Sequence, residues 1–70
     1  MKTFNETKKI IIQKKENLNL SDFLDFVVRT PYVRSIFFDV IELSEFELFL
    51  YNKKIKEYNN ELEVFLDHNF

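Results

Sequence analysis

The residues able to do chemistry in this chain are few, and their spacing forms no catalytic arrangement. The only histidine, His68, lies close to the carboxyl end, where a general base lacks rigid support. Cysteine is absent, which excludes thiolate nucleophiles, disulfides and thiolate metal sites. The serines Ser21, Ser35 and Ser44 have no base near them in sequence, and two of them have the positions of helix caps. We therefore predict that the protein is not an enzyme and uses no cofactor.

Two groups of carboxylates are the other candidates for chemistry in this chain. Asp22 and Asp25 are three residues apart and can share one face of a helix, where paired carboxylates bind a cation or exchange protons. A second acidic group consists of Asp39, Glu42, Glu45 and Glu47. Neither group has calcium-loop spacing, and the chain has no glycine for the turn of such a loop. We interpret these side chains as solvated acids, and we predict no metal site.

Basic residues are concentrated near the amino end of a chain whose formal net charge is −2. The best candidates for phosphate contacts are four lysines, namely Lys8, Lys9, Lys14 and Lys15. They spread around a predicted helix, and only Phe4 accompanies them as an aromatic platform. Arg29 and Arg34 flank the Thr30–Pro31 corner, where pairing with Asp25, Asp39 or Glu42 is the favoured interpretation. Nucleic acid is therefore the least favoured partner.

The composition favours an all-α fold, because glycine is absent and Pro31 is the only proline. A β-rich chain of this length needs several tight turns, which glycine usually supplies. We predict one helical domain over residues 1–70, a small bundle of three to four helices. The predicted helices span about 4–16, 21–29, 31–43 and 45–67. Three consecutive isoleucines also suggest a strand over residues 9–13, but no second strand is available to pair with it.

Local capping patterns set the predicted helix boundaries. Thr3 and Glu6 form a capping box for the first helix, and Ser21 is the predicted cap of the second. The second helix must end before Pro31, because a proline disfavours helical geometry in the residue that precedes it. Pro31 suits the first position of the third helix, which is apolar on almost all sides and is therefore expected to lie at the centre of the bundle.

The stretch from Ser44 to Glu47 decides the architecture. Ser44 and Glu47 form a capping box, and Leu43 can pack on Leu48 across it. An apolar stripe with steps of three and four residues also runs through this stretch, and it comprises Phe37, Ile41, Leu48, Tyr51, Ile55, Tyr58, Leu62 and Phe65. The helices over 31–43 and 45–67 can therefore be one continuous helix of about 55 Å that needs a partner. We favour a bend at Ser44, which allows a compact cluster.

The last helix carries more aromatic residues than the stripe requires. The residues predicted to contact a partner are Phe46, Phe49, Leu50 and Tyr58, with Arg29 and Arg34 at the rim. The leading hypothesis is a non-enzymatic protein–protein interaction module, a small inhibitor or adaptor that docks this aromatic helical surface on a larger protein. The chain is similar in style to small accessory proteins of phages and mobile elements, although no motif assigns it to a family.

Two alternative functions are retained. One is a self-associating structural or assembly subunit, for example of a virion, in which a homo-oligomer forms through Leu48, Tyr51, Ile55, Leu62 and Phe65. The other is a small nucleic-acid-associated regulator. No apolar run approaches the roughly 20 residues of a membrane span, and the first residues lack a signal-peptide pattern. We expect a soluble, cytoplasmic protein without a membrane partner.

Overall fold

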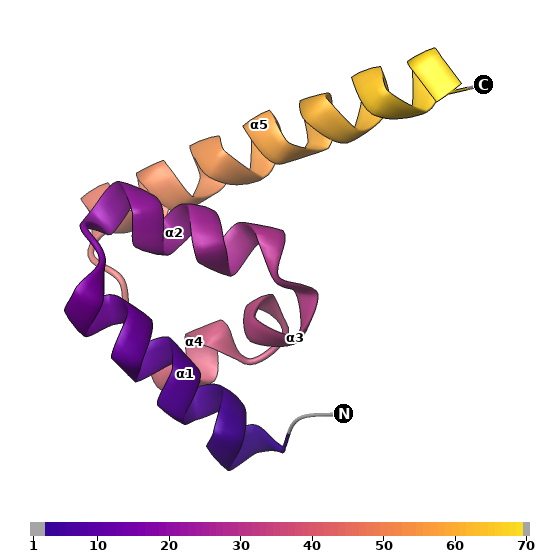
Figure 1. Cartoon of the computed structure of the whole chain (residues 1–70). Coiled ribbons are helices and arrows are strands. Elements are labelled where there is room, and N and C mark those ends of the chain that lie inside the picture. The colour runs from indigo at the N-terminus through magenta and orange to yellow at the C-terminus, as the bar shows by residue number, and fades with distance from the viewer. Residues whose placement is uncertain (1–2, 70) are drawn as a thin grey trace.

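The computed structural model describes residues 3–69 and confirms the all-α fold (Figure 1). Over that range the backbone contains no strand. Its helices are α1 (Phe4–Asn17), α2 (Leu20–Arg29), α3 (Pro31–Arg34), α4 (Phe37–Val40) and α5 (Glu45–Asn69). Residues 9–13 lie inside α1, so the alternative of a strand there is wrong.

The first two helices begin at side-chain caps. The Thr3 hydroxyl accepts a hydrogen bond of 3.2 Å from the Glu6 backbone N–H, which confirms the predicted cap of α1. The prediction that Ser21 caps the second helix is wrong, because Asn19 takes that role and α2 begins at Leu20. Asn19 accepts from the Asp22 backbone N–H at 2.8 Å and donates its amide to the Asp22 carboxylate at 3.2 Å. Asparagine is as good a helix cap as serine. The side-chain bond from the Asn19 amide to the Asp22 carboxylate further stabilises this cap.

The predicted helix over 31–43 is broken into two single turns and ends early, at Val40. The Ser35 hydroxyl donates to the Tyr32 carbonyl at 3.0 Å, and the Ile36 N–H bonds to the carbonyl of Val33 instead of the residue four positions back. Both bonds compete with the regular helical ladder. Two rings of this segment that were expected inside the bundle are exposed. The exposed fraction is 43% for Tyr32 and 54% for Phe38.

A bend before α5 is confirmed, and the two ends of the capping box are both formed. The Glu47 backbone N–H donates to the Ser44 hydroxyl at 3.2 Å, and the Ser44 N–H donates to the Glu47 carboxylate at 2.9 Å. These bonds hold the pKa of Glu47 below its usual value, with the bond from the Ser44 backbone as the largest cause. Residues 41–44 are non-helical, so the alternative of one continuous helix is excluded.

The centre of the bundle is α2, and not the 31–43 segment as predicted. Helix α2 contacts α1, α3 and α5, and it buries four apolar residues, Phe23, Leu24, Val27 and Val28. The aromatic part of the core joins α4 to its neighbours. The fully buried Phe37 ring lies edge-on to Phe23 and is stacked on Tyr51, with 5.8 Å between centroids in each pair. Helix α2 takes the central place because the two short turns cannot present a long continuous face.

Helix α5 is much longer than anything that packs against it. Its 25 residues extend over about 37 Å, whereas the 10 residues of α2 cover about 15 Å. Figure 1 shows the carboxyl-terminal turns of α5 projecting past the other helices. The radius of gyration is 13.2 Å, compared with about 11 Å for a compact chain of this length. Leu62, Val64 and Leu66 in these last turns are accordingly exposed, by 41%, 56% and 49%.

Candidate docking surface

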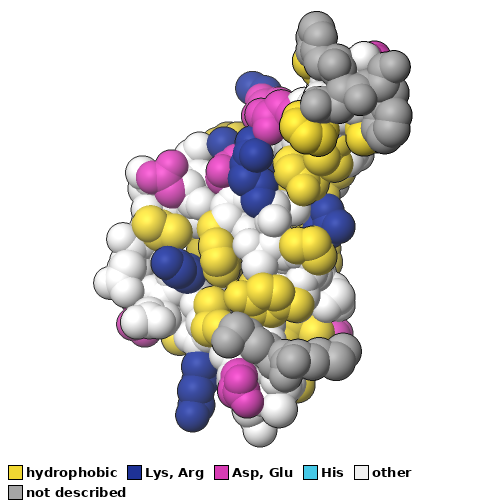
Figure 2. Space-filling model, turned by 45° about the vertical axis from the view of Figure 1, so that its right-hand side comes forward, with side chains coloured by type: hydrophobic (Ala, Val, Ile, Leu, Met, Phe, Trp, Pro, Cys, Tyr) yellow, Lys and Arg dark blue, Asp and Glu magenta, His cyan; other side chains and the backbone are white. Residues whose placement is uncertain are grey.

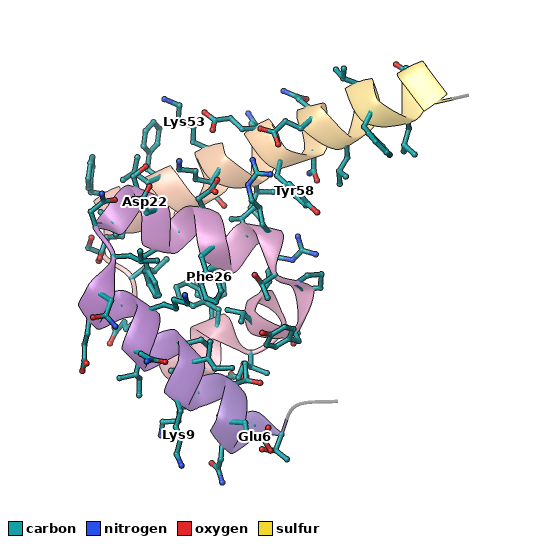
Figure 3. All side chains as sticks on the ribbon, viewed as in Figure 1. Glu6, Lys9, Asp22, Phe26, Lys53 and Tyr58 are labelled. Atoms are coloured by element: carbon teal, nitrogen blue, oxygen red, sulfur yellow. The ribbon has the colours of Figure 1, made fainter. Side chains whose placement is uncertain are left out.

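Helix α5 presents two different faces, one toward α2 and one away from it. Figure 3 shows Tyr58 directed toward α2 and Lys53 directed to the opposite side. The inner face is held by Tyr51, which is 7% exposed and stacks on Phe37. Burial raises the pKa of the Tyr51 phenol, since the phenolate is poorly solvated there, while the Arg34 charge acts in the opposite direction. This anchoring fixes which residues of α5 point outward.

The outer face consists of Phe46, Phe49, Lys53 and Lys56. The two phenylalanine rings are each 64% exposed, the largest exposed fractions among the described large apolar residues. They are three residues apart, and Lys53 and Lys56 follow Phe49 by four and seven residues, so all four share one side of the helix. An open hollow of about 450 Å³ lies beside Phe49, Lys53 and Lys56. The result is an apolar patch with a basic margin.

The sequence analysis put Leu50 and Tyr58 in the same surface, but the structure separates them from it. Both side chains are half-buried and pack against the core. Tyr58 also lies under the Arg29 guanidinium, whose carbon is 5.3 Å from the ring centroid. A cation over an aromatic face is a favourable contact, and here it fixes the ring inside the molecule. Phe46 and Phe49 thus remain as the exposed members of the predicted docking set.

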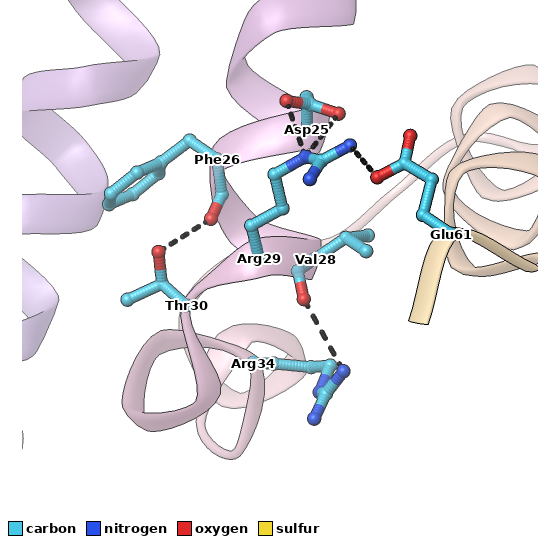
Figure 4. Close-up of polar contacts among 7 residues, drawn as sticks. All are labelled: Asp25, Phe26, Val28, Arg29, Thr30, Arg34 and Glu61. Atoms are coloured by element: carbon cyan, nitrogen blue, oxygen red, sulfur yellow. Dashed lines mark hydrogen bonds and ion pairs between the residues drawn. The ribbon is translucent and has the colours of Figure 1, made fainter. Parts of the chain in front are cut away.

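The two arginines predicted at the rim both make intramolecular contacts (Figure 4). Arg29 donates from Nε to both Asp25 carboxylate oxygens, at 3.1 and 3.0 Å, which confirms the pairing favoured from sequence. Its Nη2 reaches Glu61 of α5 at 2.7 Å. These bonds, that to Glu61 first, raise the pKa of Arg29. Arg34 donates to the Val28 carbonyl at 3.3 Å. Arg29 therefore connects α2 to α5.

The apolar stripe of α5 passes from buried to exposed along the helix. Tyr51 is buried, Ile55 and Tyr58 are half-buried, and Leu62 is 41% exposed. Leu66, one turn beyond Leu62, is 49% exposed, and it was missed in the sequence analysis although it continues the same spacing. The remaining predicted stripe members are Leu48, 41% exposed, and Phe65, 61% exposed. Figure 2 shows hydrophobic side chains gathered near the upper end of the molecule, where α5 ends.

Several of the groups considered for chemistry have structural partners. Asp22 completes the cap at Asn19, and Asp25 pairs with Arg29. The ammonium group of Lys14 lies 5.6 Å from the centroid of the Phe26 ring. No cluster of three or more residues of the metal-ligating types occurs within the described part of the chain. The His68 side chain lies outside the described residues.

A second hollow, of about 230 Å³, opens between α1, α2 and the start of α5. Its lining is apolar, and it consists of Leu18, Leu20, Phe23, Ile41 and Leu43. Lys15 and Glu47 lie at its edge, and the charge of Lys15 contributes to the lowered pKa of Glu47. The hollow is smaller than the usual range of ligand pockets, which begins near 300 Å³.

Comparisons of this chain with protein-family models, with curated proteins and with solved structures find no match. Among the described helices, none is both long enough and apolar enough to cross a membrane. The surface of α5 is therefore the feature of the molecule that points to a function.

Proposed function

We propose that this protein is a non-enzymatic protein-binding module that docks the outer face of α5 on a larger protein, as an inhibitor or adaptor. The observation that carries the proposal is the exposure of Phe46 and Phe49, each 64%, on one side of a helix whose opposite side is anchored. Large exposed rings cost free energy in water and are typical anchors of protein interfaces. A long rigid helix can place both of them in one groove.

The chemistry of the patch indicates what kind of partner surface fits it. Lys53 and Lys56 border the two rings, so an acidic margin around an apolar groove on the partner provides complementary charge. Tyr51 stacks on the core and holds the helix in place before binding. Binding to a preformed helix avoids part of the ordering cost that a flexible segment pays. A groove that accepts rings spaced three residues apart on a helix is thus the expected target.

The test is affinity capture from the native host with the wild-type chain and with a Phe46→Ser/Phe49→Ser variant. We expect a defined protein to be captured by the wild type and lost with the variant. The purified pair should then bind directly, and the variant should weaken that binding by at least about tenfold, because hot-spot rings contribute roughly 2 kcal/mol or more. Far-UV circular dichroism should show unchanged helicity, since both rings are exposed.

Val64→Ser is the matched control for this experiment. Val64 is 56% exposed on the same helix, but it lies 15 residues beyond Phe49, about 22 Å away along the axis. Capture should be unaffected by this change. Capture that persists when both rings are removed, or that is lost equally with Val64→Ser, contradicts docking through the outer face.

Self-association through the whole stripe is less well supported by the fold. Tyr51 and Ile55, two of its five predicted members, belong to the internal core or pack against it. Pairing along the full stripe with a second copy requires α5 to leave α2. Without such a change the stripe is accessible only at Leu48 and in its carboxyl-terminal part.

A further inference from the structure

The inference concerns the last turns of α5, beyond the point where Arg29 of α2 meets Glu61. Leu62 and Leu66 continue the same stripe that packs on α2, and they are 41% and 49% exposed. An apolar stripe that is continuous with an internal interface has the geometry to accept another helix in the same way. We name this surface the tail face and define it by Leu62, Glu63, Leu66 and Asp67.

The tail face is acidic. From residue 57 onward the sequence contains the acids Glu57, Glu61, Glu63 and Asp67 and no lysine or arginine. Glu61 is already paired with Arg29, whereas Glu63 and Asp67 are exposed. A surface that covers Leu62 and Leu66 must therefore combine apolar side chains with positive charge.

The chain itself carries such a surface on α1. This helix has four lysines against two glutamates. Phe4 and Ile12 are 48% and 41% exposed, and Lys8 lies between them at steps of four residues, so the three side chains share one side of the helix. From Phe4 to Ile12 the helix rises about 12 Å, whereas the tail face from Leu62 to Asp67 rises about 8 Å, so the amino face is long enough to cover it. We name this surface the amino face.

The two faces lie far apart within one molecule. Figure 1 shows α1 and the carboxyl-terminal turns of α5 at opposite sides of the structure. The tail face therefore cannot contact the amino face of its own chain. These two surfaces of opposite charge can therefore meet only between two copies of the chain.

We propose that the tail face of one copy docks on the amino face of a second copy, and that the contact is reciprocal, so that a two-fold dimer forms. The area supports reciprocity. A large apolar side chain carries on the order of 150 Å², and Leu62, Leu66, Phe4 and Ile12 are each exposed by about half. Apolar atoms make up roughly 57% of a typical interface. One contact that covers the exposed parts of these four side chains therefore buries about 500 Å² in total, and a reciprocal pair of contacts buries about 1,000 Å². The second value is near the lower limit of specific interfaces, whereas the first is typical of incidental contacts.

An interface near the lower size limit is typical of weak, reversible association, with a dissociation constant on the order of micromolar to millimolar. Sedimentation velocity over a concentration series across that range should show a shift from monomer to dimer. The double change Leu62→Gln/Leu66→Gln should leave a monomer at every concentration. Val64→Gln is the matched control, because Val64 is also exposed but is rotated by about 160° from this stripe. It should leave the equilibrium unchanged.

Charge reversal identifies the surface that is occupied. Lys8→Glu and Glu63→Lys should each weaken the dimer by about tenfold or more, because each change places like charges in both contacts. An equimolar mixture of the two variants should regain the wild-type affinity as a heterodimer. In that heterodimer one contact keeps the original pair and the other has the pair reversed.

The outcomes separate the alternatives. A monomer throughout the series overturns the proposal, and so does a dimer that is insensitive to Lys8→Glu, since another surface then covers the tail face. Failure of the mixture to regain affinity excludes the reciprocal arrangement. The proposal does not depend on docking through the outer face, because Phe46→Ser/Phe49→Ser should leave dimerisation unchanged. Either proposal can therefore fail alone.

Discussion

Truncation of the Phe37 side chain tests the central packing of this fold. Phe37 belongs to α4, which has only four residues and depends on tertiary contacts for its helical geometry. Its ring is fully buried and contacts Phe23 and Tyr51, which come from α2 and α5. One side chain therefore links three helices. The Phe37→Ala change should affect the whole molecule and not only α4.

The expected magnitude follows from burial. Replacing a buried phenylalanine with alanine costs about 3–5 kcal/mol, and a chain of this size has a net stability of about 3–5 kcal/mol. Phe37→Ala should thus bring the free energy of unfolding close to zero. The neighbouring Phe38 is 54% exposed and meets Phe37 and Tyr51 only edge-on. Phe38→Ala should cost about 2 kcal/mol, from roughly half of a full burial term plus two edge-on ring contacts of about 0.5 kcal/mol each.

Urea unfolding followed by far-UV circular dichroism measures both values. Phe38→Ala should keep a cooperative transition at lower urea, whereas Phe37→Ala should show no folded baseline. Equal destabilisation by the two changes, or a loss below about 1 kcal/mol for Phe37→Ala, refutes the argument that this ring joins α2, α4 and α5.

The remaining predictions concern the start and the inner face of α5. Ser44→Ala removes one half of the capping box and should cost about 1 kcal/mol, a fall of roughly 4–8 °C in Tm, whereas Ser35→Ala, where no capping box exists, should cost clearly less. The folded-state pKa of Glu47 is lowered, so its contribution to stability is present above the unfolded pKa and lost as the pH falls through the folded pKa. Glu47→Gln should therefore reduce the acid dependence of Tm, and an unchanged acid limb contradicts the role of this bond. The folded-state pKa of Tyr51 is raised, so its contribution is lost as the pH rises through that pKa. In an absorbance titration Tyr51 should ionise at a higher pH than a free tyrosine, and Tyr51→Phe should remove that late step.

The residues predicted to contact a partner show how much of a surface helical spacing alone can predict. Phe46 and Phe49 were selected because they lie off the stripe, and both are exposed. Leu50 was selected by the same reasoning and Tyr58 as an aromatic member of the stripe, yet both turn toward the core. Helical spacing gives the angle between two side chains on one helix, but it does not tell which angle another helix covers. Lys53 and Lys56 were missed because their place beside the rings matters only once the outer face is known.

The amino-acid sequence was sufficient to determine the all-α fold, the cap at Thr3, the capping box at Ser44 and the helical state of residues 9–13. The caps depend on residues within one turn of each other, so the chain can specify them before it packs. The helical fold follows from composition, because glycine for tight turns and a second strand to pair with residues 9–13 are both missing from the sequence. Tertiary structure alone decided that α2 is the centre of the bundle, that the segment after Pro31 forms two short turns, and that α5 extends beyond α2. These features arise because apolar surfaces that are distant in the sequence compete for the same core. A chain this short cannot bury all of them, and part of its longest helix stays exposed.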